Sequence, residues 1–153
     1  MFRQIIVIAA VGLASLNLAS LNVAYAQQPE ALSIQWHNSP STAFAEAEAS
    51  GRPVLVFVGT QWCHYCKIMQ TETWNHPTIV ETLAKNFIAL KLDGDRDQSI
   101  VAPLKLSGYP ATLVYTSQGQ PVVKHEGKMS AAQTYAWLVN SYRDAQTPRV
   151  ANR

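Results

Sequence analysis

The sequence predicts an α/β protein built around one mixed sheet, because strand-like and helix-like segments alternate along most of its 153 residues. Residues 54–59 (VLVFVG) form a continuous apolar run of β-branched and aromatic residues, which is typical of a strand buried on both faces. Residues 111–127 contain two strand patterns joined by a glycine-containing turn, and a helical pattern follows. We therefore expect the order β-α-β-α-β-α-β-β-α, with helices flanking a central sheet.

The first expected elements are a short strand and a helix. Residues 32–37 (LSIQWH) alternate in hydropathy, which favours a strand. Ser39 can cap a helix, the run 42–50 is rich in alanine, and Gly51 is a typical residue just beyond a helix end. This combination predicts a helix of about three turns.

The middle of the chain adds two helical segments and a second long strand. The pattern is helical over 64–74, and Pro77 suits the first position of a further helix over 76–86. Residues 87–93 (FIALKLD) then have the composition of a strand. Beyond this strand we expect a short helix within 95–108 that the final glycine stops.

The last element is predicted to be an amphipathic helix over 130–145, which begins with a serine cap. Its apolar face is expected at Tyr135, Leu138, Val139 and Tyr142, which are spaced three or four residues apart.

Residues 1–26 differ from the rest and predict a cleaved signal peptide. Arg3 precedes an apolar run over 5–16, and residues 24–26 read Ala-Tyr-Ala, the small-residue pattern of a cleavage site. The apolar run is shorter than the ~20 residues that span a bilayer. We therefore expect export to the periplasm or secretion, with no stable membrane insertion after cleavage.

The remaining chain is expected to form one domain over 27–147, with a flexible tail over 148–153. The 48% hydrophobic content of the full chain is typical of a globular protein with a single core. Lys and Arg number 12 against 10 Asp and Glu, without a long run of one sign. Because nucleic-acid binding needs concentrated positive charge, this composition argues against a nucleic-acid partner.

The stretch WCHYCK (residues 62–67) contains both cysteines of the chain, and a redox pair, a metal ligand pair and a structural disulfide are all considered. A structural disulfide here would close too short a loop to stabilise the fold much. Because the pair follows a buried strand and opens a helix, the helix dipole and free N–H groups would stabilise a Cys63 thiolate. Cys66, one turn further along, could attack a mixed disulfide on Cys63. The pattern favours a redox pair.

His64 and Tyr65 stand between the cysteines and are candidate tuning residues. A protonated His64 would stabilise the Cys63 thiolate and make the pair more oxidising. The alternative is a solvent-facing histidine without such a role.

Several segments together resemble the thioredoxin-like superfamily, namely VLVFVGTQWCHYCK (54–67), FIALKLD (87–93), SGYPATLVY (107–115) and Gly127. Within it, the chain is similar to exported members related to the C-terminal domain of the periplasmic disulfide-interchange reductase. The resemblance covers roughly residues 51–139 and implies a thioredoxin-like fold. It also implies a thiol-disulfide oxidoreductase that acts on protein thiols and disulfides, with the Cys63–Cys66 disulfide in place of any other cofactor.

The resemblance implies roles for four further residues. Pro110 would be the cis-proline that faces the cysteines, and Tyr109 would offer its backbone to an incoming peptide. A trans turn proline is the alternative for Pro110. Trp62 matches the family's aromatic residue before the first cysteine, and Lys91 matches a strand lysine of thioredoxin, so both are assigned to tuning the pair.

One position departs from the family pattern. Thioredoxins and many relatives carry a buried acid six positions before the first cysteine, where it helps to move the proton of the resolving thiol, and this chain has Phe57 there. No carboxylate nearby in the sequence replaces it. The thiol of Cys66 would lose its proton through water, through Lys91 or by another route, which favours slower exchange with a specific partner.

Two other functions could use the same residues. Two thiolates suit Cu(I), so copper handling is an alternative, whereas a four-ligand zinc site is disfavoured because the histidines are scattered, at His37, His64, His76 and His125. Covalent haem is disfavoured because Lys67 stands where the motif C-x-x-C-H requires histidine. A non-catalytic module that binds a partner near Pro110 is the second alternative. We assign no metal site.

The favoured direction is reduction of protein disulfides, with a membrane protein as a possible electron donor, because of the resemblance to an interchange reductase. An oxidising compartment would also suit an oxidase. Isomerase activity ranks third, because the chain shows no added dimerisation domain.

Overall fold

The computed structural model describes residues 32–147, so the predicted signal peptide (1–26) and tail (148–153) lie outside the described residues. The strands are β1 (Trp36–His37), β2 (Val54–Gly59), β3 (Ile88–Asp93), β4 (Ala111–Tyr115) and β5 (Pro121–Glu126). The helices are α1 (Pro40–Ser50), α2 (His64–Ile68), α3 (Pro77–Asn86), α4 (Gln98–Val101) and α5 (Ala131–Gln146), together with a π-helical turn η1 (Met69–Thr73) and a 3-10 turn η2 (Ala102–Leu104). The predicted order of elements is confirmed.

The five strands form one mixed sheet in the order β1-β3-β2-β4-β5. The strands β1, β3 and β2 run parallel, and β4 and β5 are antiparallel to their neighbours. In the register of β2 and β3, Phe57 pairs with Lys91 and Gly59 pairs with Asp93. Since paired residues of neighbouring strands point to the same face, each pair shares one side of the sheet.

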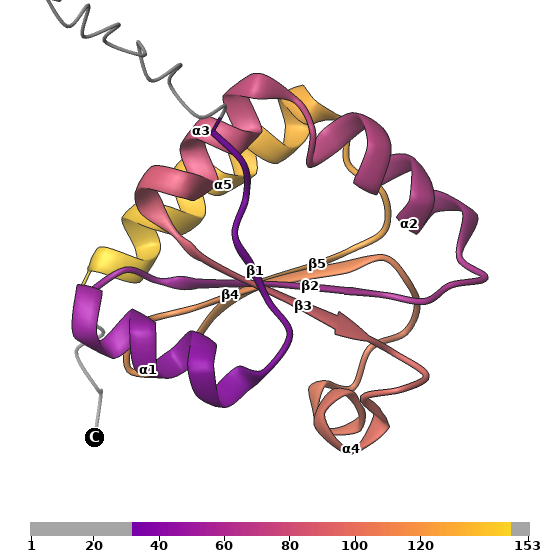
Figure 1. Cartoon of the computed structure of the whole chain (residues 1–153), viewed down its shortest axis with the longest axis horizontal. Coiled ribbons are helices and arrows are strands. Elements are labelled where there is room, and N and C mark those ends of the chain that lie inside the picture. Colours follow the sequence, from indigo (N-terminus) through magenta and orange to yellow (C-terminus); the bar gives the residue numbers. More distant parts are fainter. Residues whose placement is uncertain (1–31, 148–153) are drawn as a thin grey trace, which may run out of the picture. The chain divides into compact units, whose positions relative to one another are not determined.

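Helices cover both faces of this sheet (Figure 1). The elements α2, α3 and α5 lie on one face, and α1 and α4 lie on the other. Every residue of β2 is buried, which agrees with the continuous apolar run in the sequence. Leu55 and Phe57 belong to the core under α3 and α5, whereas Val54, Val56 and Val58 belong to the core under α1.

Two predicted boundaries at the first strand and the second helix were wrong. The strand expected over 32–37 is reduced to Trp36–His37, which pairs with β3 alone at the edge of the sheet. The continuous helix expected over 64–74 changes at Met69 into the π-helical turn η1. Hydropathy patterns do not distinguish these winding types, because the side chains still alternate between core and solvent.

The short helix expected within 95–108 ends before its glycine. The helix α4 continues into η2 and stops at Lys105, which has a left-handed φ of 49°. The apolar face predicted for α5 was also partly wrong. Tyr135 and Val139 are exposed, and the buried positions are Thr134, Leu138 and Ser141, where small side chains let the helix approach the sheet closely.

Other predicted details are confirmed. The helix α1 follows Ser39 and ends at Gly51, whose left-handed φ of 72° suits glycine. Pro77 occupies the first turn of α3. Among residues 32–147, none of the helices combines the length and apolar character needed to cross a bilayer.

Candidate active site

The two cysteines lie at the start of α2, just beyond the end of the central strand β2. Cys63 is the N-cap of α2, and its Sγ accepts the backbone N–H of Cys66 at 3.1 Å. The two sulfur atoms are joined as a disulfide. Cys63 is 5% exposed and Cys66 is fully buried. Cys63 is thus the more exposed residue of the pair.

Exposed aromatic side chains surround the disulfide. Trp62 is 69% exposed, and its indole Nε1–H donates a hydrogen bond to Asp95 Oδ2 at 2.9 Å. The ring of Tyr109 meets Trp62 edge-on, with 6.1 Å between centroids. Tyr65 is 55% exposed. Exposed rings fixed beside a reactive sulfur provide an apolar rim on which a polypeptide can pack.

His64 and Tyr65, the residues between the cysteines, both point away from the core. Both side chains are exposed, and their rings contact each other with centroids 5.6 Å apart. The structure thus places His64 at the surface next to Cys63 rather than in a buried network.

The Tyr109–Pro110 peptide bond is cis. Pro110 is buried, and its carbonyl accepts the N–H of Gly127 at 2.7 Å. Gly94 fixes the ring of Tyr109 from the other side, because a Cβ at Gly94 would overlap the Tyr109 hydroxyl. Tyr109 therefore contacts the loop that follows β3. The same loop carries Asp95, the hydrogen-bond partner of Trp62.

The region beneath the disulfide is apolar. Phe57 is fully buried, and its ring packs edge-on against Trp74 at 5.3 Å and tilted against Trp36 at 6.3 Å between centroids. Phe57 belongs to the same buried cluster as both cysteines. The position that carries an acid in many thioredoxins is thus part of an aromatic cluster in this protein.

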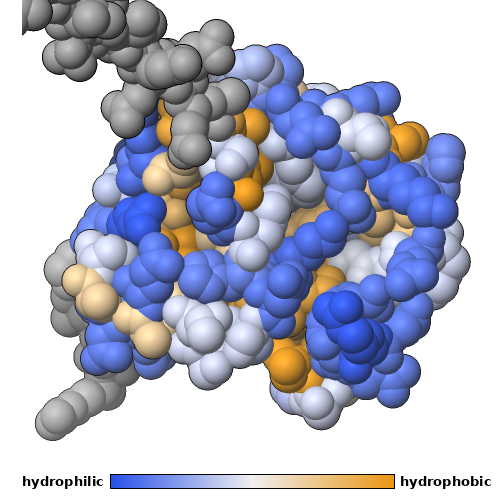
Figure 2. All heavy atoms as spheres, viewed as in Figure 1, coloured by the Kyte–Doolittle hydropathy of each residue, from blue (hydrophilic) through white to orange (hydrophobic). Residues whose placement is uncertain are grey.

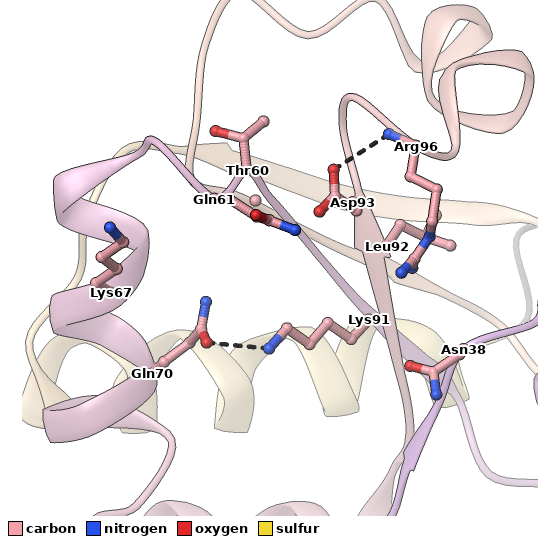
Figure 3. Close-up of a pocket in the computed structure, with 10 residues that line it drawn as sticks. Asn38, Thr60, Gln61, Lys67, Gln70, Lys91, Leu92, Asp93 and Arg96 are labelled. Atoms are coloured by element: carbon pink, nitrogen blue, oxygen red, sulfur yellow. Dashed lines mark hydrogen bonds between the residues drawn. The ribbon is translucent and has the colours of Figure 1, made fainter.

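A polar cleft of about 540 Å³ lies beside this cluster, between α2 and the end of β3 (Figure 3). Its lining includes Gly59, Gln61, Lys67, Gln70, Lys91, Asp93 and Arg96. Lys91 Nζ reaches across the cleft and donates a hydrogen bond to Gln70 Oε1 at 3.0 Å. The predicted tuning residue Lys91 therefore faces this cleft and not the exposed face of the disulfide.

The profile of the family described as Thioredoxin-like matches residues 35–117, more than half of the chain. The chain belongs to the thioredoxin-like family.

Solved thioredoxin-like structures share the fold. A thioredoxin from Thermus thermophilus superposes with a TM-score of 0.68 at 24% identity, covering 74% of this chain and 91% of that one. The C-terminal domain of DsbD from Neisseria meningitidis, in its reduced form, superposes with a TM-score of 0.58 at 18% identity, covering 70% of this chain and 99% of that domain.

Curated relatives match a similar part of the chain. The uncharacterized protein B0495.5 of Caenorhabditis elegans is 26% identical over 97 residues, which is 58% of this chain and 13% of that protein. The thiol:disulfide interchange protein DsbD of Salmonella typhi is 28% identical over 99 residues, which is 61% of this chain and 18% of that protein. The chain thus spans less than a fifth of the length of these relatives.

The turn after β3 holds a carboxylate with a shifted pKa. Asp97 accepts the backbone N–H of Asp93 at 2.8 Å and pairs with the guanidinium of Arg96 at 3.2 Å. These contacts, first the Arg96 hydrogen bond and then the N–H of Asp93, lower the pKa of the Asp97 carboxyl. The turn therefore keeps a fixed negative charge that organises the loop carrying Asp95.

The described residues offer few ligands for the metal site that was considered as an alternative. Within residues 32–147 there is no group of three or more His, Cys, Asp or Glu side chains placed to hold one metal ion. Of the four histidines, only His64 adjoins the cysteine pair in the chain, and it forms no such group with them.

Sequence reasoning missed several residues of the site. Asp95, Gly94 and Gln70 were not assigned, although they hold Trp62, Tyr109 and Lys91 in place. The only available signal was the DGDRD stretch after β3, which indicated a turn and not its contacts. Contacts between residues more than 30 positions apart depend on strand register, which this sequence pattern does not reveal.

Proposed function

We propose that this protein is a thiol-disulfide oxidoreductase that exchanges the Cys63–Cys66 dithiol and disulfide with protein substrates. The observation that carries the proposal is the disulfide at the start of α2, in which Cys63 is 5% exposed and Cys66 is fully buried. Family membership and the DsbD relatives support it. No organic cofactor is required, because the two sulfur atoms themselves carry the electrons.

The reaction follows from the different access of the two sulfurs. In the reduced protein, the Cys63 thiolate attacks a substrate disulfide, forms a mixed disulfide and releases one substrate thiolate. Cys66 then attacks Cys63 Sγ, which restores the Cys63–Cys66 disulfide and releases the second substrate thiolate. Two electrons pass from the protein to the substrate, and a separate donor must reduce the protein again.

We assign the surrounding residues to substrate binding and tuning. The exposed rings of Trp62 and Tyr65 form the apolar rim for a polypeptide, and Tyr109 with Pro110 offers backbone for pairing with an extended segment. His64, exposed beside Cys63, favours its thiolate when protonated. Lys91 tunes the pair from the cleft behind it.

We propose reduction as the physiological direction, in an extracytoplasmic compartment. The sequence of residues 1–26 supports export, and the relatives named thiol:disulfide interchange protein support exchange with protein thiols. A membrane protein is the proposed electron donor, because exported reductases need reducing equivalents from across the membrane in an oxidising compartment.

A redox titration of residues 27–153 in glutathione and dithiothreitol buffers tests this proposal, with the fluorescence of Trp62 next to the pair as the signal. We expect one reversible two-electron transition near the ~−270 mV of thioredoxin. A Cys66→Ser variant should trap substrate proteins as mixed disulfides on Cys63, and a Cys63→Ser variant should trap none.

Other results of the titration would indicate a different function. A midpoint near the ~−120 mV of strong oxidants would make the protein a disulfide donor. A protein without a reversible transition would not be an oxidoreductase, and stoichiometric Cu(I) on the reduced pair would then support copper handling.

A further inference from the structure

A glycine backbone stands between the buried sulfur of Cys66 and the cleft beside α2. Cys66 is fully buried, and a Cβ built on Gly59 would lie 3.2 Å from its Sγ. The same Gly59 lines the cleft. A side chain at this position would press against the sulfur, so the glycine lets the strand that lines the cleft pack directly on Cys66.

Apolar side chains pack around Cys66. Its buried cluster includes Phe57, Met69 and Trp74, none of which can accept a proton. Because the thiolate and not the thiol attacks a disulfide, Cys66 must lose a proton before it resolves the mixed disulfide. The cleft lined by Gly59 is a polar space next to Cys66.

Asp93 stands directly across from Gly59. The two residues pair in the parallel register of β2 and β3, so the Asp93 side chain lies on the face that Gly59 presents to Cys66. Asp93 Oδ1 accepts the N–H groups of Asp95 at 2.9 Å and Arg96 at 3.2 Å, which fixes the carboxylate. Figure 3 shows its other oxygen directed to the side of Gln61, within the cleft.

The charged groups around the cleft come from each element packed against it. The helix α2 contributes Lys67, β3 contributes Lys91 and Asp93, and the following turn contributes Arg96, which pairs with Asp97 outside the cleft. Lys91 donates to the neutral amide of Gln70 and not to a carboxylate. Among the described residues that line the cleft, Asp93 supplies the only carboxylate.

We propose that Asp93 accepts the proton of Cys66 through water in this cleft. This step rests on the proposed oxidoreductase function. The Cys66 S–H bond breaks, its proton passes through water to the Asp93 carboxylate, and the Cys66 thiolate attacks Cys63 Sγ of the mixed disulfide. The Cys63–Cys66 bond forms, the substrate thiolate leaves and takes a proton from water, and Asp93 returns its proton to the solvent.

Dithiodipyridine tests the step, because each released thiopyridine absorbs light. The reduced protein should release one thiopyridine when Cys63 attacks and a second when Cys66 resolves the mixed disulfide, so stopped-flow absorbance separates the two events. Asp93→Asn keeps an oxygen that can accept the N–H groups of Asp95 and Arg96 but removes the negative charge. Glu48→Gln, which removes one exposed carboxylate from α1 on the opposite face of the sheet, is the control.

We expect Asp93→Asn to leave the first release unchanged and to slow the second by on the order of tenfold or more. The second release of the wild type should depend weakly on pH near neutrality, whereas that of the variant should rise with pH as hydroxide takes the proton. Added formate, small enough for the open cleft, should restore part of the rate to Asp93→Asn. The Glu48→Gln protein should match the wild type.

Three results would overturn the assignment of Asp93. They are a second release in Asp93→Asn that equals the wild type at every pH, an equal slowing in both variants, and a slowing that formate does not relieve. A wild-type protein that lacks the first release would instead contradict the oxidoreductase function itself, so the two failures are distinguishable.

Discussion

At the scale of single residues, two glycines near the disulfide have opposite surroundings. Gly94 lies against the ring of Tyr109 so closely that a Cβ there would overlap the phenol hydroxyl. Gly108, next to Tyr109 in the chain, has open space on its Cβ side within 4 Å. Neither has a left-handed φ, so the difference between them is one of contact alone. Tyr109 in turn contacts Trp62 at the rim.

We therefore expect Gly94→Ala to displace Tyr109 and to destabilise the fold by about 1–3 kcal/mol through overpacking. Gly108→Ala should stay within about 0.5 kcal/mol of the wild type. Urea unfolding of both variants measures the difference in free energy of unfolding. Tryptophan fluorescence should change only in Gly94→Ala, since Trp62 loses its fixed neighbour. Equal stabilities would contradict the close contact.

At the scale of elements, a serine precedes both α1 and α5, but only one of the two serines caps its helix with a side-chain hydrogen bond. Ser130 Oγ accepts the N–H of Gln133 at 3.3 Å, and Gln133 Oε1 accepts the N–H of Ser130 at 2.9 Å, which is a complete capping box for α5. Ser39 precedes α1 without a side-chain hydrogen bond to the helix backbone N–H groups. The residue before Ser130, Met129, also receives a hydrogen bond from Thr73 Oγ1 and so links α5 to η1.

Ser130→Ala should cost about 1 kcal/mol of stability, because it leaves N–H groups at the start of α5 without their partner. Ser39→Ala should cost less, since its hydroxyl makes no such bond. Chemical denaturation gives both costs, and hydrogen exchange should show faster exchange at residues 131–134 in the first variant alone. A larger loss from Ser39→Ala would show that the capping box does not hold α5.

Part of the element structure could not be predicted from the sequence. The boundaries of α1 and α3 follow from local signals, namely a glycine with left-handed φ and a proline in the first turn. The buried face of α5 does not follow from local signals, because the apolar residues Tyr135 and Val139 are exposed while the polar residues Thr134 and Ser141 are buried. Burial there is set by how closely the helix can approach the sheet, and periodicity alone carries no such information.

At the scale of the whole molecule, ionisable groups define a pH window for stability. The Lys124 hydrogen bond and the N–H of Ser107 lower the pKa of Glu126, and Arg96 lowers the pKa of Asp97. Because the unfolded chain then binds protons more readily, stability is complete above the usual carboxyl pKa of about 4 and falls as the pH drops further. Burial raises the pKa of Tyr115 in the folded protein. The unfolded chain therefore releases this proton at a lower pH, and the stability of the fold falls as the pH rises beyond about 10.

We expect the urea midpoint to be flat between these limits and to decline on both sides. The double variant Asp97→Asn/Glu126→Gln should weaken the acid decline, and Tyr115→Phe should weaken the alkaline one. Glu48, exposed on α1 and without an ion pair among the described residues, provides the control variant Glu48→Gln. Midpoints measured from about pH 2 to about pH 11 check this, and identical acid limbs in all variants would contradict it.

An apolar pocket lies away from the disulfide, next to α1 and α4. In the view of Figure 2, hydrophobic atoms gather between α1 and α4, where Phe44, Ile100 and Leu104 line a pocket of about 280 Å³. It lies on the face of the sheet opposite α2, so it takes no part in the proposed exchange.

The sequence by itself determined the fold class, the order of the elements and the reactive pair. These depend on local patterns, since hydrophobic periodicity, turn residues and the spacing of Cys63 and Cys66 act over a few residues. Only the tertiary structure decided what surrounds the pair. Phe57 becomes part of an aromatic cluster, Asp95 reaches Trp62, and Asp93 comes to face Gly59 beside Cys66. The physical reason is that strand register and packing bring distant residues together, and a one-residue shift would turn each side chain to the other face.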